Sequence, residues 1–150
     1  MNNFFQFEND FVDSLRCIPM VVRMKLDTCG IKLKLHQWNQ FNQEERQKLV
    51  DLPCKDSEEI KNYREFLQNL VIEKTGEIAK ELEIEAHPTW RNETIIPSEI
   101  LVQAKNFNVE ITLEKWKILT PLQRFALLKL SKSKHENSNF LPALKEFHII

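Results

Sequence analysis

The sequence predicts an all-α fold, and three observations carry this prediction. Only two of the 150 residues are glycines, Gly30 and Gly76, which leaves little room for tight hairpins or for a phosphate-binding loop. Apolar residues recur at intervals near four along most of the chain. One stretch of 35 residues occurs twice, and its pattern is helical in both copies. We expect a compact bundle of about seven helices that forms a single domain over residues 1–150.

The repeated stretch comprises residues 18–52 and 96–130, which align without a gap at a spacing of 78 residues. The identical positions include a proline that opens the unit, a tryptophan in its middle and an arginine before its closing apolar run: Pro19 and Pro97, Trp38 and Trp116, Arg46 and Arg124. A chance similarity between two helical segments is the alternative. Because the identities fall where structure would demand them, we favour a duplicated helical unit.

Each copy predicts the same succession of helices. In the first copy, Pro19 suits an opening helical turn and Gly30 supplies the stop. In the second copy, Asn108 takes the place of Gly30 as the left-handed cap. The alternating residues 31–35 and 109–113 by themselves indicate strands, but we interpret them as short extended entries into small helices.

The helix that closes each copy has its own N-cap, Asn42 in the first and Thr120 in the second. The first closing helix, residues 43–52, is mostly polar and is expected at the surface. The second, residues 121–130, is apolar nearly all round, which predicts a buried central helix.

Three further helices flank or separate the copies. An apolar stripe from Phe7 to Ile18 predicts an N-terminal helix. Asp56 begins a long helix with a capping box at its start, and Gly76 ends it. Residues 83–95 lack a helical period and are expected to form a long surface loop. A last helix is expected around residues 140–147.

Composition excludes several classes of function. The net charge of −1 gives no global attraction to nucleic acid or to anionic lipid. The chain has no apolar run of about 18 residues that predicts a membrane span, and its acidic N-terminus lacks the basic region of a signal peptide. Three cysteines without a CxxC spacing, Cys17, Cys29 and Cys54, indicate free thiols in a reducing cytoplasm.

No sequence motif for catalysis or for metal binding stands out. The chain has no GxSxG, no cysteine with a local histidine context and no GxxxxGK[ST] loop. None of the four histidines pairs with a cysteine or a carboxylate at a metal-ligand spacing: His36, His87, His135 and His148. We therefore predict a protein that is not an enzyme and that carries no metal or other cofactor.

Three tryptophans and two arginines occupy notable positions. Trp38 and Trp116 stand at equivalent positions on helical stripes and are predicted to be core residues. Trp90 lies in a polar loop, where it either binds a partner or folds back as a plug, and both interpretations remain open. Arg46 and Arg124 are each expected to form either an ion pair or a hydrogen bond to a nearby carbonyl group.

A polar, basic connector joins the last two apolar helices. Its simplest interpretation is a solvated loop capped by Ser138 or Asn139. The functional interpretation is a docking surface for an acidic partner, because the polar run is longer than a cap requires. We assign this surface to six residues: Lys132, Lys134, His135, Glu136, Asn137 and Asn139.

Two long stretches of the sequence resemble the nitrate reductase-associated protein family (NarM-type proteins) of cyanobacteria and some photosynthetic eukaryotes. They are FFQFENDFVDSLRCIPMVVRMKLDTCGIKL and LQRFALLKLSKSKHENSNFLPALKEF. The resemblance covers nearly the whole chain and is weakest between residues 72 and 96. It implies a part in obtaining active nitrate reductase, an enzyme with a molybdenum cofactor, and it supplies no catalytic residues.

Three functional hypotheses follow. The first is a cytoplasmic, non-catalytic accessory or maturation factor that binds an assimilatory nitrate reductase and is required for its activity. The second is a carrier that holds a molybdopterin-type cofactor between the repeat halves, with contributions from Trp90, Arg91 and Arg124. The third is a redox-sensing regulator of nitrate assimilation that works through the cysteines. We prefer the first, because a factor needed for another enzyme's activity does not require an active site of its own.

Overall fold

The computed structural model describes residues 4–9, 17–132 and 137–150. The chain divides into two compact units. The N-terminal unit contains Met1–Phe4 and Glu8–Glu85, and the C-terminal unit contains Phe5–Phe7 and Ala86–Ile150. The single domain expected over residues 1–150 stays a prediction.

The described residues form eight α-helices, four in each unit. The N-terminal unit contains α2 (Met20–Cys29), α3 (Leu35–Asn39), α4 (Gln43–Asp51) and α5 (Ser57–Thr75). The C-terminal unit contains α6 (Ser98–Asn106), α7 (Leu113–Ile118), α8 (Pro121–Lys132) and α9 (Phe140–Glu146). Three short 3-10 helices, η1 (Gln6–Glu8), η2 (Thr89–Arg91) and η3 (Asn137–Asn139), and one ribbon of β1 (Ile31–Lys32) and β2 (Lys80–Glu81) complete the secondary structure.

This composition confirms the all-α prediction. Residues 10–16, which hold most of the N-terminal helix expected from the sequence, lie outside the described residues. No helix within the described ranges is long and apolar enough to cross a membrane.

Short polar side chains cap the starts of α4, α5, α7 and α8, as the sequence predicts. The side-chain oxygens of Asn42 and Asp56 accept hydrogen bonds from backbone N–H groups three residues later, at 2.9 and 2.8 Å. Thr112 and Thr120 do the same at 3.3 and 3.1 Å. Because each bond satisfies an N–H that lacks a partner inside the helix, these residues fix where the helices start.

The core of the N-terminal unit forms where α5 packs on α2. From α5, Tyr63 and Leu67 are almost fully buried, and from α2 so are Val22 and Cys29. The polar helix α4 contributes only Leu49 and Val50 to the buried set, so the predicted surface position of this helix is confirmed.

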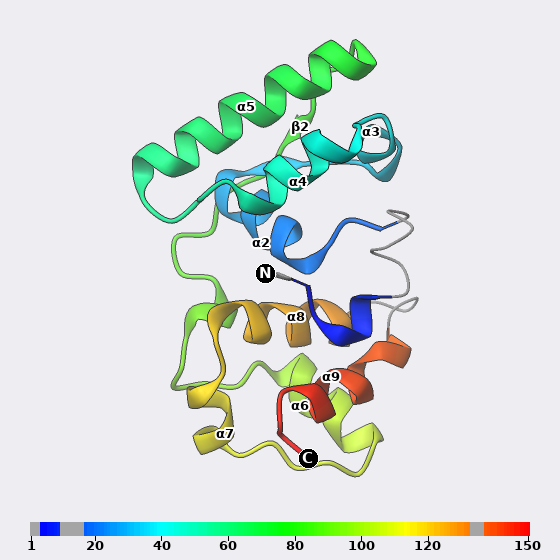
Figure 1. Ribbon diagram of the computed structural model, residues 1–150. Helices are drawn as coiled ribbons and strands as arrows, with labels where there is room; N and C mark the ends of the chain where they lie inside the picture. The colour runs from blue at the N-terminus through cyan, green and yellow to red at the C-terminus, as the bar shows by residue number, and fades with distance from the viewer. Residues whose placement is uncertain (1–3, 10–16, 133–136) are drawn as a thin grey trace. The chain divides into compact units, whose positions relative to one another are not determined.

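In the C-terminal unit α8 is the central helix, as the sequence predicts. Its residues 124–128 and Leu130 are all buried, and it packs on α6, α9 and η2. Figure 1 shows α6 and α9 beside α8. Because nearly every face of α8 meets another element, its sequence can be apolar all round.

The two repeat copies share their order of helices. Helices α2, α3 and α4 begin at residues 20, 35 and 43, and α6, α7 and α8 begin at 98, 113 and 121, each 78 residues later. Trp38 and Trp116 are both fully buried, as predicted. The guanidinium carbons of Arg46 and Arg124 lie 5.7 and 5.8 Å from the centroids of these rings. The two units therefore repeat both an order of helices and a contact of arginine with tryptophan.

The ribbon is the main departure from the expected fold. Ile31–Lys32 forms a strand that pairs with Lys80–Glu81, although we expected an extended entry into a helix. Residues 109–110 of the second copy form no strand. The difference follows from what comes after each copy, because only the first is followed by α5 and the returning β2.

Gly30 allows the chain to leave α2 and enter this ribbon. Its φ of 77° is left-handed, and a Cβ at this position would lie 2.8 Å from Ile84 Cγ1 and 2.9 Å from the carbonyl oxygen of Leu82. Gly76, which ends α5, is also left-handed at 73°, but nothing lies within 4 Å of its Cβ position. A side chain would thus meet both backbone strain and steric crowding at Gly30, but backbone strain alone at Gly76.

We predict that Gly30→Ala destabilises the protein by at least about 3 kcal/mol, because it adds a clash to the left-handed strain. Gly76→Ala is the matched control and is expected to cost about 1 kcal/mol, from strain alone. Urea unfolding followed by circular dichroism measures both. Equal losses would show that the approach of residues 82–84 to Gly30 is not a tight constraint.

Candidate functional site

The predicted docking surface near the C-terminus is only partly described. Lys134, His135 and Glu136 lie outside the described residues, and Asn137 begins η3. Asn139 precedes α9 but its side chain makes no cap hydrogen bond, so the predicted capping role of this residue is wrong. Lys132 Nζ lies 3.6 Å from Glu99 Oε2, which places one member of the surface in an ion pair between α8 and α6. The docking role of these six residues stays a prediction.

Trp90 folds back as a plug. It is 5 % exposed, and its ring packs edge to face on Phe125 with the two centroids 5.5 Å apart. The exposed Arg91 lays its guanidinium group 4.8 Å from the centroid of the Trp90 ring. Of the two interpretations of Trp90, partner binding and internal packing, these contacts support internal packing.

Arg124 holds this plug in place. It is 3 % exposed, its Nε donates to the carbonyl oxygen of Trp90 at 2.7 Å, and its Nη1 donates to that of Leu119 at 2.7 Å. Burial lowers the pKa of Arg124 from its ordinary value, and the negative charge of Glu93 opposes this. The expected bonding of Arg124 to carbonyl groups is confirmed. These contacts give no support to the suggestion that Trp90 and Arg124 hold a cofactor, since both are used in packing.

The cysteines were the basis of the redox hypothesis, and two of them are buried. Cys29 and Cys54 lie in the N-terminal unit, and Cys17 is half-buried. Burial, with a further contribution from nearby Cys54, raises the pKa of Cys29 to about 12. A thiol that stays protonated is a poor nucleophile, so this environment disfavours a redox role for Cys29.

An open groove with a volume of about 450 Å³ runs along α5 in the N-terminal unit. Its lining residues stand on successive turns of the helix: Lys61, Arg64, Glu65, Gln68 and Asn69. The segment that follows α5 passes beside the helix, and side chains of α5 bond to Ala79 and Glu81. We call these five α5 residues, together with Ala79, Glu81 and Glu83, the edge groove.

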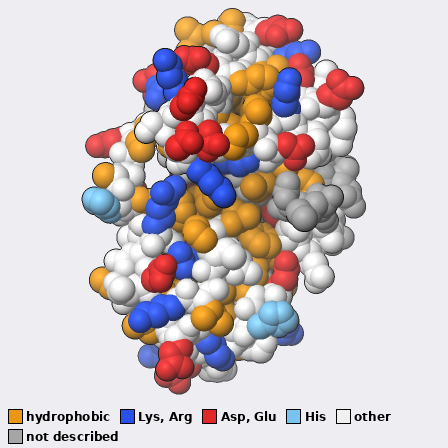
Figure 2. All heavy atoms as spheres, turned by 60° about the vertical axis from the view of Figure 1, so that its left-hand side comes forward, with side chains coloured by type: hydrophobic (Ala, Val, Ile, Leu, Met, Phe, Trp, Pro, Cys, Tyr) orange, Lys and Arg blue, Asp and Glu red, His pale blue; other side chains and the backbone are white. Residues whose placement is uncertain are grey.

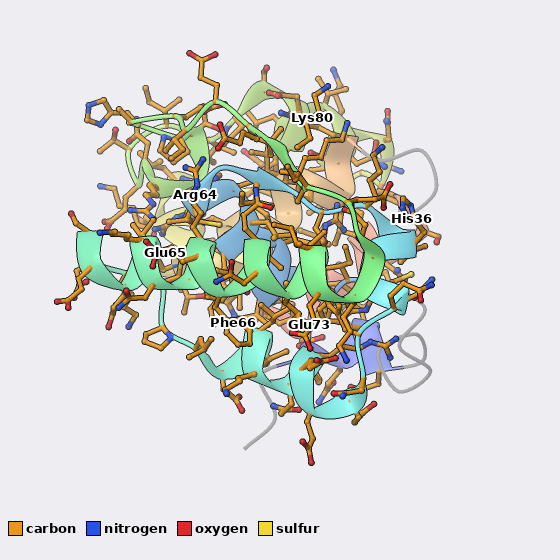
Figure 3. All side chains as sticks on the ribbon, turned by 90° about the horizontal axis from the view of Figure 1, so that it is seen from above. His36, Arg64, Glu65, Phe66, Glu73 and Lys80 are labelled. Atoms are coloured by element: carbon orange, nitrogen blue, oxygen red, sulfur yellow. The ribbon has the colours of Figure 1, made fainter. Side chains whose placement is uncertain are left out.

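Gln68 and Arg64 fasten the passing segment to the helix. The Gln68 amide donates to the carbonyl oxygen of Ala79 at 3.0 Å and accepts from the Ala79 N–H at 3.1 Å. Arg64 Nη2 forms an ion pair with the Glu81 carboxylate, and its Nη1 donates to the carbonyl oxygen of Cys29 at 3.4 Å. Figure 3 shows Arg64 on the side of α5 that faces the strand carrying Lys80.

At the start of this segment His36 Nε2 lies 2.8 Å from Glu77 Oε1. The hydrogen bond with His36 is the main reason that the pKa of Glu77 is lowered. The segment is therefore anchored at Glu77, Ala79 and Glu81, and Glu83 follows the last of these anchors.

The sequence reasoning missed the edge groove. A signal was present, because Leu82 and Ile84 alternate with three glutamates over residues 81–85, a pattern typical of a half-exposed strand. The groove is open, and its lining residues offer charged and hydrogen-bonding groups to a binding partner. No group of three or more metal-binding side chains occurs within residues 4–9, 17–132 and 137–150.

We predict that Arg124→Met destabilises the protein by about 3 kcal/mol, because it leaves two carbonyl groups of buried residues without a donor. Arg46→Met is the matched control. Arg46 is more exposed and bonds to the carbonyl groups of Trp38 and Asn39 at 3.2 and 3.1 Å, so its loss should cost less than about 1 kcal/mol. Chemical denaturation gives both values, and a larger loss for Arg46→Met would contradict this assignment.

The raised pKa of Cys29 predicts a pH dependence of stability. Above its ordinary pKa of 9.0 the thiol ionises in the unfolded chain but stays protonated in the folded one up to about 12. Stability should therefore fall as pH rises through this window, by about 1.4 kcal/mol between about pH 8 and about pH 10. Cys29→Ala should lack this part of the loss. Identical pH profiles for the two proteins in urea unfolding would contradict it.

Comparison with known proteins adds one finding. The family model described as conserved nitrate reductase-associated protein matches residues 4–147 of the chain. No curated protein and no solved structure gives a significant match. Since the match spans both units and all eight described α-helices, the chain belongs to the family of conserved nitrate reductase-associated proteins.

Proposed function

We propose that this protein is a non-catalytic accessory factor that binds a molybdenum-cofactor nitrate reductase in the cytoplasm and is required for the activity of that enzyme. The observation that carries the proposal is the family match over residues 4–147, because the family is described by its association with nitrate reductase. An accessory factor acts by binding, and the edge groove supplies an exposed polar surface for it.

A binding role agrees better with the structure than a carrier role does. A carrier of a pterin cofactor needs aromatic walls and free donors in one pocket. Trp90 and Arg124, the residues suggested for that task, are both buried, and the guanidinium group of Arg124 donates to the carbonyl oxygen of Trp90. Two of the three residues assigned to a cofactor carrier are therefore used in packing, which favours the binding role.

The proposal includes the origin of the two units by duplication. It is supported by the spacing of 78 residues between the starts of three pairs of helices. It is also supported by the two arginine contacts with tryptophan at 5.7 and 5.8 Å. The second copy contains the apolar α8, which is the central helix of its unit, whereas the first copy is followed by α5 and the edge groove.

Tagged protein isolated from nitrate-grown cells is expected to bring nitrate reductase with it. In a strain that lacks the protein, the reductase should be present but inactive and depleted of molybdenum, as metal analysis of the purified enzyme measures. A Gly76→Ala variant, which leaves the described surfaces intact, serves as the control for complementation.

A reductase that is fully loaded with molybdenum and active in the deletion strain would contradict the maturation role. Absence of the reductase from the isolated material would contradict the binding role. The two readouts therefore test loading and association separately.

A further inference from the structure

The outer edge of β2 is unpaired. The register pairs Lys32 with Lys80, and the N–H of Leu82 donates to the carbonyl oxygen of Gly30 at 2.7 Å, so the even-numbered residues of this segment point their backbone groups at β1. In an antiparallel pair the intervening residues point theirs the other way. The N–H and C=O groups of Glu81 and Glu83 have no hydrogen-bond partner in the part of the chain that the structure describes.

Gln68 shows how this edge can be paired. Its side-chain amide both donates to and accepts from the backbone of Ala79, at 3.0 and 3.1 Å, as one residue of a neighbouring strand would. The same side chain closes the edge at Ala79, so an added strand would begin beside Glu81. The edge therefore has a defined end and a defined register.

Space beside this edge is provided by the groove. A strand added to β2 lies about 4.8 Å from it, over the α5 residues that line the groove. In Figure 3, Phe66 and Glu73 lie on the side of α5 away from the strand that carries Lys80. An added strand would rest on Lys61, Glu65 and Asn69, so alternate side chains of its occupant would meet a polar floor.

The charges around the edge indicate what kind of segment would bind there. Arg64 is paired with Glu81, which leaves Glu65 and Glu83 against Lys61 among the charged residues of the edge groove. The exposed Lys80 is next to Glu81 on β2, and alternation along a strand places its side chain on the opposite face of the ribbon. Figure 2 shows acidic and basic side chains interspersed over one face of the molecule. A segment with lysine or arginine at alternate positions is complementary to this edge. A second copy of this chain would bring the same glutamates opposite one another and is disfavoured.

We propose that the edge groove is the docking site for an extended, basic segment of a partner protein, which adds to β2 as a third strand. Backbone hydrogen bonds to Glu81 and Glu83 supply affinity, and the glutamates supply the preference for basic residues. The identity of the partner as nitrate reductase rests on the proposed function, whereas the edge and its chemistry do not.

A fluorescent peptide of about nine residues with alternating lysine and threonine tests this directly by anisotropy. The full-length protein should bind it saturably, and an otherwise identical peptide with glutamate for lysine should not bind. A third peptide, methylated on alternate backbone nitrogens, keeps its charge but cannot pair along the edge. It should bind at least about tenfold more weakly.

Glu83→Lys should weaken binding of the lysine–threonine peptide at least about tenfold. Glu73→Lys is the matched control, since it makes the same change of charge on the opposite side of α5 and should leave the affinity unchanged. Circular dichroism of both variants checks that they fold. Equal binding of the methylated and unmethylated peptides would overturn strand addition, and equal effects of the two variants would overturn this location.

Two further outcomes separate this inference from the proposed function. If the wild-type chain brings down nitrate reductase and Glu83→Lys does so equally well, the docking site is wrong although the proposed function stands. If the peptide binds as expected but no reductase is retained, the edge stands and the proposed partner fails. Self-association of the wild-type chain that Glu83→Lys abolishes, seen by sedimentation, would assign the edge to a second copy and overturn the proposal.

Discussion

The left-handed turn at Gly30 is the constraint on which the N-terminal unit depends. Its carbonyl group accepts from Leu82 at 2.7 Å, and Ile84 Cγ1 lies 2.8 Å from where a Cβ would be. Only glycine allows both the turn and this approach. The contact brings β2 back onto β1 after α5 and so creates an edge strand beside a helix. The candidate binding surface is thus a consequence of how one helix ends.

The C-terminal unit has the same order of helices, but it is built around a buried central helix. Its central helix α8 is almost wholly buried. Arg124 of α8 donates hydrogen bonds to the carbonyl oxygens of Trp90 and Leu119, and the bond to Trp90 holds η2 against α8. Trp116 Nε1 also reaches this region, donating to the carbonyl oxygen of Asn92 at 2.8 Å. Residues 90–92 are therefore bonded to the core helices of the C-terminal unit. The N-terminal unit instead keeps a polar helix face exposed beside a strand.

Local chemistry explains which parts of this fold can be predicted from sequence. Caps such as Asn42 and Asp56 act within three residues, so the starts of their helices are evident in the chain. The apolar character of α8 likewise gives its burial directly. The ribbon depends on Ile31 meeting Glu81, a contact between residues far apart in the chain, and two-residue strands leave almost no periodic signal. The candidate site lies at this ribbon, which is why sequence reasoning placed the docking surface elsewhere.

Hydrogen exchange of the protein with and without nitrate reductase, read out by mass spectrometry, tests strand addition at β2. The reductase should slow exchange at the unpaired amides of Glu81 and Glu83 and leave exchange in α8, which is already buried, unchanged. Protection of these two amides would show that the partner pairs along β2. Protection confined to the C-terminal unit, with residues 81–83 exchanging as in the free protein, would contradict docking at β2.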